Sequence, residues 1–269
     1  MGRKSTVNLP EEEVVEKYKN GESMVKLASF YEVKTHHIDW ILRKHGVEKR
    51  KNQINSRRYS FNENFFEKID TEEKSYWLGF MAADGFVQTR GNTFGISLSS
   101  VDKSHLEKFN KSLESNYPIH DYLSDTAYKK NTPYSRLLLT SEKAKSDLIR
   151  NGIVENKTLV LSFPEIEKNL INHYIRGYFD GDGSLSAYKK QYQFKVVGTK
   201  EFLNSIFLHI GFRGKDLYRR HYNEKNTYYI SIGGNNQVEK IMDFLYEDAT
   251  IYLDRKFLKY QEFKHSRPE

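Results

Sequence analysis

The sequence contains one nine-residue pattern twice, and this duplication restricts what the chain can fold into. The first copy, WLGFMAADG, occupies residues 77–85, and the second, IRGYFDGDG, occupies residues 175–183. Apolar residues recur in both copies at helical spacing, and the closing Gly85 and Gly183 predict a left-handed helix stop. We therefore expect two helices that end at equivalent points of two repeated halves.

Each expected helix carries two small residues four positions apart. They are Gly79 and Ala83 in the first copy and Gly177 and Gly181 in the second. One stripe of each helix thus has almost no side chain, which allows helix backbones to approach closely. We expect the two helices to pack against each other.

The acidic residue before each closing glycine lies at an electrostatically unfavourable place. Asp84 and Asp182 come at expected helix C-termini, where the helix dipole favours cations. If the helices pack together, the two carboxylates repel each other unless a divalent cation lies between them. The pattern predicts a shared metal site, and the simpler alternative is that each acid merely closes its helix.

The two copies resemble the signature of the LAGLIDADG homing endonucleases, in their single-chain form with two motifs. The resemblance covers roughly residues 61–265 and departs from the repeat at Ala82, where the second copy has Asp180. It implies an α+β fold in which two pseudo-symmetric αββαββα halves pack through paired motif helices. The two antiparallel sheets would form a DNA-binding saddle, preceded here by a small three-helix domain.

The resemblance also implies an activity and a set of site residues. A monomer would cleave double-stranded DNA at a long asymmetric target, with Mg²⁺, or Mn²⁺ in its place, as cofactor. The alternatives on the same fold are an intron RNA maturase and a transcription regulator that does not cleave. The implied metal-binding residues are Asp84, Asp182, Ala83 and Gly181.

One lysine from each half is expected to organise the attacking water in proteins of this family. The matching positions are Lys157 and Lys256, although each also suits an ordinary solvated lysine. Together with Asp84 and Asp182 they form the implied catalytic set. Histidine occupies no repeated position, so the sequence reveals no general base.

Residues 10–45 predict three short helices that resemble the helix-turn-helix of resolvases and many bacterial regulators. Pro10 and three glutamates start the first helix, Ser23 caps the second, and the third begins at Thr35. The alternative is a three-helix interaction bundle. Residues 43–58 contain seven Lys and Arg residues and only one acidic residue, Glu48. This excess of positive charge favours contact with DNA phosphates.

Basic and polar residues of the third helix, the following tract and the expected strands are the candidate DNA-binding residues, since a two-stranded ribbon can enter the major groove. A charged strand face is also typical of plain solvent surface. The candidates are Lys34, Thr35, His36, Arg43, Lys49, Arg50, Lys51, Arg57, Arg58, Lys129, Lys130, Arg136, Lys189, Lys190, Arg219 and Arg220.

These features divide the chain into four parts. In the first half, Asp70 should cap the motif helix, with Glu73 completing a capping box. In the second half, Phe163 and Pro164 should start the motif helix. The expected parts are a helix-turn-helix domain at 1–46, a basic linker at 47–60, a first half at 61–162 and a second half at 163–269.

Composition excludes some classes of site and suggests a compartment. The 269 residues include 43 Lys and Arg against 36 Asp and Glu, which gives a net charge of +7 and weakly favours a polyanionic partner. The absence of cysteine excludes disulfides, thiolate zinc sites and cysteine nucleophiles. No apolar run approaches the ~20 residues of a membrane span, and no signal peptide is visible. We expect an intracellular, cytoplasmic protein.

Overall fold

The computed structural model describes residues 9–48, 58–125, 130–189, 191–212, 217–219 and 226–266. The chain forms two compact units, residues 1–58 and residues 59–269, called here the N-terminal and C-terminal units. Each unit has its own hydrophobic core. The longest helices in the described ranges have 12 residues, so none of them could cross a membrane.

The N-terminal unit consists of three helices, which the sequence pattern predicts closely. They are α1 (Glu11–Lys19), α2 (Met24–Phe30) and α3 (Thr35–Lys44). Ser23 caps α2 by accepting a hydrogen bond from the Lys26 amide at 3.1 Å. The apolar side chains that the helices share form the core, namely Val14, Tyr18, Leu27, Ala28, Ile38, Ile41 and Leu42.

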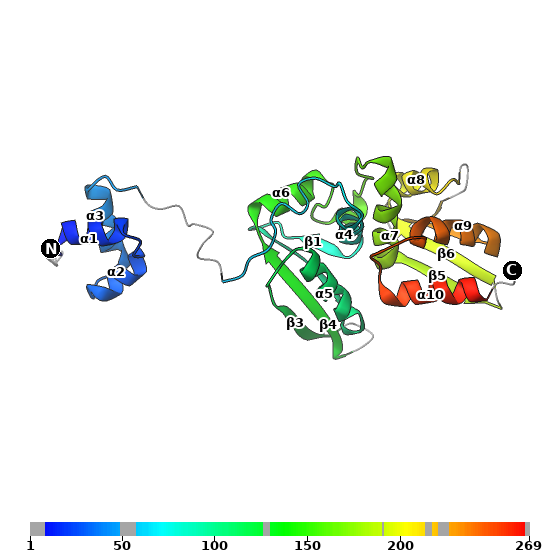
Figure 1. Ribbon diagram of the computed structural model, residues 1–269, viewed down its shortest axis with the longest axis horizontal. Coiled ribbons are helices and arrows are strands. Elements are labelled where there is room, and N and C mark those ends of the chain that lie inside the picture. Colours follow the sequence, from blue (N-terminus) through cyan, green and yellow to red (C-terminus); the bar gives the residue numbers. More distant parts are fainter. Residues whose placement is uncertain are drawn as a thin grey trace. The chain divides into compact units, whose positions relative to one another are not determined.

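The C-terminal unit contains two halves with the same order of elements (Figure 1). The first half comprises α4 (Glu72–Ala83), β1 (Gly85–Val87), β2 (Thr93–Ser99), α5 (Lys103–Ser112), β3 (Ile119–Ser124), β4 (Thr132–Thr140) and α6 (Glu142–Arg150). The second half comprises α7 (Ile171–Asp182), β5 (Gly183–Tyr188), β6 (Gln191–Gly198), α8 (Lys200–His209), β7 (Tyr218–Arg219), β8 (Tyr228–Gly233) and α9 (Asn235–Tyr246). The final helix, α10 (Asp254–His265), follows α9. The αββαββα repeat is confirmed.

The two sheets have equivalent strand orders and equivalent registers. The first has the order β1-β2-β4-β3 and the second β5-β6-β8-β7, with every neighbouring pair antiparallel. Gly85 pairs with Ile96 in the first sheet, and Gly183 pairs with Val196 in the second. Helices cover one face of each sheet, as Figure 1 shows for α9 and α10 over β5 and β6. The other face of each sheet carries mostly polar and aromatic side chains.

Helices α4 and α7 lie side by side at the centre of the C-terminal unit (Figure 1). At Gly79, an added Cβ would stand 2.0 Å from the carbonyl oxygen of Tyr174, and at Gly177 it would stand 2.0 Å from that of Tyr76. Both glycines are therefore required by the close approach of the helix backbones. The paired motif helices that the two stripes of small residues predict are confirmed.

The glycines that close the motifs act differently from the prediction. Gly85 is not among the residues with positive φ, and Gly183 has φ −91° and ψ 169°, so neither makes a left-handed stop. A Cβ on Gly183 would instead stand 2.1 Å from a ring carbon of Phe179, and one on Gly85 would stand 2.6 Å from the sulfur of Met81. These glycines are needed because the first strand of each sheet turns tightly back over its helix.

Two predicted helix starts are wrong. Thr71, and not Asp70, caps α4, because its hydroxyl accepts from the Lys74 amide at 3.2 Å while Asp70 pairs with the Lys74 side chain at 2.8 Å. Glu73 accepts a hydrogen bond from Ser112 instead of closing a capping box. In the second half, α7 begins at Ile171 after a 3-10 turn at 168–170, so Pro164 does not start it.

Candidate active site

Asp84 and Asp182 lie at the ends of the paired motif helices, as the sequence predicts. Asp84 is the C-cap of α4, and Asp182 is the last residue of α7. Asp84 is half-buried and Asp182 is exposed. Burial, and after it the charge of Asp182, raise the pKa of Asp84 to about 6. The two carboxylates therefore repel each other at one end of the helix pair.

Lys157 and Lys256 occupy equivalent places in the two halves. The Lys157 ammonium donates to the carbonyl oxygen of Gly85, and the Lys256 ammonium donates to that of Gly183. Each lysine therefore binds the residue that follows the motif acid of its own half. This equivalent arrangement in both halves sets the two lysines apart from ordinary solvated lysines, and Lys256 is only 5% exposed.

Burial and charge act in opposite directions on these lysines. Burial lowers the pKa of Lys157, while the carboxylates of Asp182 and Asp84 raise it. Burial likewise lowers the pKa of Lys256 to about 8, against an opposing effect of Asp180. Two cations and two carboxylates thus face one another at the ends of α4 and α7.

The residues at the helix ends fit a divalent cation. A Cβ on Gly181 would stand 2.4 Å from the Ala83 Cβ and 3.0 Å from a carboxylate oxygen of Asp84, so α4 and α7 are in contact beside the acids. Within the described ranges there is no cluster of three or more His, Cys, Asp or Glu side chains. A pair of carboxylates with further oxygens from solvent and phosphate is the donor set that Mg²⁺ prefers, and it does not suit zinc.

A cavity of about 290 Å³ opens beside Asp182. The Tyr178 hydroxyl, on this side of α7, donates to the Val197 carbonyl at 2.8 Å. Burial and then the Asp182 charge raise the pKa of Tyr178 well above its usual range, so it remains a neutral phenol. The residues that line the cavity are Ala82, Ala83, Leu161, Tyr178, Asp182, Val197, Gly198 and Thr227.

Asp180 is the clearest site residue that sequence reasoning missed. It is fully buried and accepts from the Tyr76 hydroxyl at 2.7 Å, the Leu253 amide at 2.7 Å and the Tyr246 hydroxyl. Burial raises the pKa of Asp180, and these three donors oppose the shift. Its signal in the sequence was the departure from the repeat at Ala82, which a comparison of the two motifs already exposes.

Arg176 was also missed by the sequence analysis. It is fully buried between the halves, where it donates to Glu72 at 2.6 Å and to the carbonyl oxygens of Leu245 and Ile251 at 2.8 and 2.9 Å. A buried arginine needs such a complete set of acceptors. It ties α4 to the segment that connects α9 and α10.

The sheets present paired tyrosines with a cation on the face away from the core. In the first sheet, Tyr122 stacks on Tyr134 with centroids 5.3 Å apart, and the Arg136 guanidinium lies 5.3 Å from the Tyr134 ring. In the second, Tyr218 stacks on Tyr229 at 5.3 Å, and Lys195 lies 4.2 Å from the Tyr229 ring. Arg136 was a candidate from the sequence, whereas Tyr122, Tyr134 and Tyr229 were not.

The other candidate DNA-binding residues lie at several places. On α3, Lys34, Thr35, His36 and Arg43 are exposed, although Arg43 pairs with Asp39 at 2.7 Å. Lys130 and Lys189 are exposed in the C-terminal unit, and Arg58 is exposed as the last residue of the N-terminal unit. Seven candidates lie outside the described residues, and the Arg219 side chain is likewise not described; the seven are Lys49, Arg50, Lys51, Arg57, Lys129, Lys190 and Arg220.

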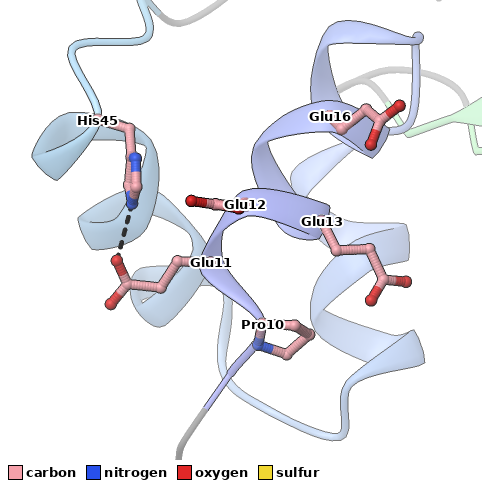
Figure 2. A pocket seen from close by; sticks show the side chains of 6 residues that line it. All are labelled: Pro10, Glu11, Glu12, Glu13, Glu16 and His45. Carbon is pink, nitrogen blue, oxygen red and sulfur yellow. Dashed lines mark hydrogen bonds and ion pairs between the residues drawn. The ribbon is translucent and has the colours of Figure 1, made fainter.

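The N-terminal unit has an acidic hollow of about 570 Å³ beside the first turn of α1 (Figure 2). Glu11 accepts from His45 at 2.7 Å and from Lys44 at 2.8 Å, which fastens α1 to the end of α3. The hollow is lined by Pro10, Glu11, Glu12, Glu13, Glu16 and His45. An anionic surface repels phosphates, so this side of the unit does not suit DNA.

Comparisons with known proteins agree with this geometry. Residues 71–150 match the family model described as the LAGLIDADG-like domain. No curated protein matches the sequence. Among solved structures, meganuclease I-SmaMI bound to uncleavable DNA shares 13% identity over 71% of this chain and 88% of its own, with a TM-score of 0.49. The homing endonuclease I-LtrWI bound to target DNA shares 14% identity over 76% of this chain and 90% of its own, with a TM-score of 0.47.

At these TM-scores, the assignment of the chain rests on the family model and on the motif helices. The matched residues include the whole of α4, both hairpins and α6. The second half repeats this order of elements around a motif of the same pattern. Residues 71–150 are therefore similar to a LAGLIDADG-like domain.

Proposed function

We propose that this protein is a site-specific, divalent-metal-dependent endonuclease of double-stranded DNA. One observation carries the proposal: Asp84 and Asp182 end two touching helices, and each half adds a lysine at an equivalent place, Lys157 or Lys256. A fold without catalysis has no use for two carboxylates that repel each other. The proposed site has two pseudo-equivalent halves, which suits a duplex with two strands to cut.

The side chains have separate roles in this proposal. Asp84 and Asp182, with the adjoining backbone of Ala83 and Gly181, hold the metal. A bound Mg²⁺ or Mn²⁺ supplies charge stabilisation at the scissile phosphate and lowers the pKa of an attacking water. Lys157 and Lys256 direct positive charge at the phosphate oxygens and orient the water beside their own motif acid.

We propose that DNA lies across the sheet faces that carry the tyrosines. Arg136 and Lys195 contact the duplex there, together with the exposed hairpin residues Lys130 and Lys189. The N-terminal unit adds a helix-turn-helix, with α3 in a major groove and Lys34, Thr35 and His36 towards the bases. The expected boundaries at 46, 60 and 162 are part of this proposal, and the action on DNA implies an intracellular protein.

The experiment selects bound sequences from random duplexes with the full-length protein, and then incubates the best sequence with Mg²⁺ or with EDTA. Cleavage that needs Mg²⁺ and yields one pair of defined ends is expected. Selective binding with no cleavage in Mg²⁺ or Mn²⁺ would instead indicate a regulator. Preference for structured RNA over every duplex would indicate a maturase.

A further inference from the structure

The two halves of the candidate site are not built equally, and the difference begins at Asp180. Its side chain is fully buried on α7, two residues before the motif acid. One of its three donors is the backbone amide of Leu253, at 2.7 Å. A buried carboxylate with three donors holds those donors in fixed places.

Leu253 is the N-cap of α10, the residue just before that helix begins. Its carbonyl oxygen accepts from the amide of Lys256 at 2.9 Å, which closes the first turn of that helix. The Lys256 side chain then returns to α7, where its ammonium donates to the carbonyls of Phe179, at 3.4 Å, and Gly183. Asp180 therefore lies in a closed ring of contacts that runs from α7 to Leu253, along one helical turn to Lys256, and back to α7.

The first half of the unit helps to hold the same turn. The Tyr76 hydroxyl of α4 donates to Asp180 at 2.7 Å. The Arg255 guanidinium binds both carboxylate oxygens of Asp102 at 3.0 Å, and Lys108 pairs with Asp254 at 2.6 Å. The start of α10 is thus fastened on both sides of Lys256.

Lys157 has a different setting. The motif position that corresponds to Asp180 is Ala82, which has no polar group. Lys157 begins a 3-10 turn at 157–159 and follows Asn156, whose backbone is left-handed at φ 53°. This turn is held through its backbone, since the carbonyl oxygen of Leu159 accepts a hydrogen bond from the side-chain amide of Asn226 at 2.8 Å.

We infer that Asp180 is a positioning residue for Lys256, and that the two strands of a DNA substrate are therefore cut with unequal dependence on it. The inference rests on the proposed function. The strand cut with the help of Lys256 should require Asp180, whereas the strand cut with the help of Lys157 should not. Partners that orient a reacting group typically change rates by about 10–100-fold.

The test uses the full chain, Mg²⁺ and the selected duplex with a different fluorophore on each strand. Lys157→Ala and Lys256→Ala first establish which strand depends on which lysine. Asp180→Asn is then expected to slow the strand that depends on Lys256 by about 10–100-fold and to leave the other within about twofold. Nicked duplex should accumulate, cut in the strand that Lys256→Ala spares.

A matched control separates positioning from general loss of stability. Asp147 is another buried carboxylate, on α6, where it pairs with Lys143 at 3.0 Å and Arg150 at 2.9 Å. Asp147→Asn should lower the melting temperature without changing the ratio of the two strand rates. That ratio is measured within one sample, so a smaller folded fraction does not alter it.

The outcomes are distinct. Equal slowing of both strands by Asp180→Asn, while the lysine variants show opposite strand preferences, would overturn the inference alone. Normal cutting of both strands by Lys256→Ala would overturn both the inference and the proposed role of the lysines. If Asp180→Asn does not fold, Tyr76→Phe serves instead, because it removes one of the donors to Asp180. This variant should give the same strand preference to a smaller degree. Equal rates for the two strands in Tyr76→Phe would also overturn the inference.

Discussion

Gly177 meets the carbonyl oxygen of Tyr76 so closely that a Cβ would stand 2.0 Å from it. The same distance separates a Cβ on Gly79 from the carbonyl oxygen of Tyr174, so the contact is reciprocal across α4 and α7. Both obstacles are backbone atoms, which cannot rotate away. These contacts set the distance between the helices, and with it the distance between the ends that carry Asp84 and Asp182.

Gly177→Ala should therefore separate α4 from α7 and lower the free energy of unfolding by about 3 kcal/mol. Denaturant unfolding measures this loss, and any folded variant should also lose metal binding. Gly233→Ala is the control, because no atom lies within 4 Å of its added Cβ. Similar stability for the two alanine variants would contradict the close approach.

Asp84→Asn and Asp182→Asn should each abolish double-strand cleavage and leave DNA binding intact, since phosphate and base contacts lie elsewhere. The raised pKa of Asp84, about 6, means that its ionisation costs stability as pH rises from about 4 through 6. At pH 7.5 in EDTA, Asp84→Asn should therefore be more stable than the natural protein by about 1 kcal/mol.

Adding Mg²⁺ should reverse that order of stability. A ligand that binds only the folded state raises the melting temperature, and the asparagine variants should lose most of that rise. Thermal unfolding of the natural protein and both variants, in EDTA and in Mg²⁺, gives the six values required. Near-normal double-strand cutting by either variant would show that its carboxylate is not part of the active site.

His105 should make the C-terminal unit sensitive to acid. The Tyr76 hydroxyl donates its proton to Asp180, so the His105 Nε2 must donate to the Tyr76 oxygen, at 2.9 Å. The Nδ1 of His105 is buried and has no hydrogen-bond partner among the described residues. Burial, helped by Lys108 and Arg255, lowers the pKa of His105 to about 3. Its stability contribution is thus complete above pH 6.5, the unfolded value, and is lost as pH falls from 6.5 towards 3.

Between pH 7 and pH 5 the loss should be about 2 kcal/mol, measured by urea unfolding. His105→Gln keeps an N–H donor for Tyr76 and cannot titrate, so it should lose less over the same interval. The carboxylates with raised pKa remain in both proteins, and the difference between the two curves isolates His105. Identical pH dependence would contradict this assignment.

Arg136 should read one base pair. Its Nε donates to Ser97 at 2.7 Å and its guanidinium lies between aromatic rings, so the orientation of the planar guanidinium is restricted. Arg136→Ala should cost about 1–3 kcal/mol and relax specificity at one position, whereas Lys189→Ala should weaken all sequences alike and reduce the salt slope by about 1. Competition binding with single-base variants of the target distinguishes the two effects, and a uniform loss for Arg136→Ala would refute base reading.

Removal of residues 1–58 should leave a folded C-terminal unit, because its core is separate from that of the N-terminal unit. The shortened protein should bind far more weakly and still cleave at high concentration, since linked modules gain affinity through effective concentration. Its salt dependence should also be shallower, because the tract from 43 to 58 is lost. Equal affinity of the two proteins would show that the N-terminal unit is not a DNA anchor.

The duplicated motif predicted the centre of the fold because its chemistry is local. Helical spacing, two small residues and one acid are all read within nine positions. The predicted cap at Asp70 failed because two neighbouring residues can both cap, and only the backbone path selects Thr71. The predicted start at Pro164 failed for a similar reason, since proline suits a loop as well as a first turn.

The rest of the candidate site depends on contacts between distant parts of the chain. In the sequence, the whole second sheet separates Tyr246 and Leu253 from Asp180, and only the folded structure brings them together. The left-handed conformation expected at Gly183 also gave way to a packing requirement against Phe179. Neither relation has a signature within a short window of sequence.

The fastening of α10 to the first half limits how modular the halves are. Asp102, Lys108 and Tyr76 all belong to the first half, yet they complete the setting of Lys256 in the second. A chimaera that joins this second half to a foreign first half would have to carry those three side chains with it. The two similar halves are thus interdependent, and substitutions on the strands should preserve the setting of Lys256 better than an exchange of whole halves.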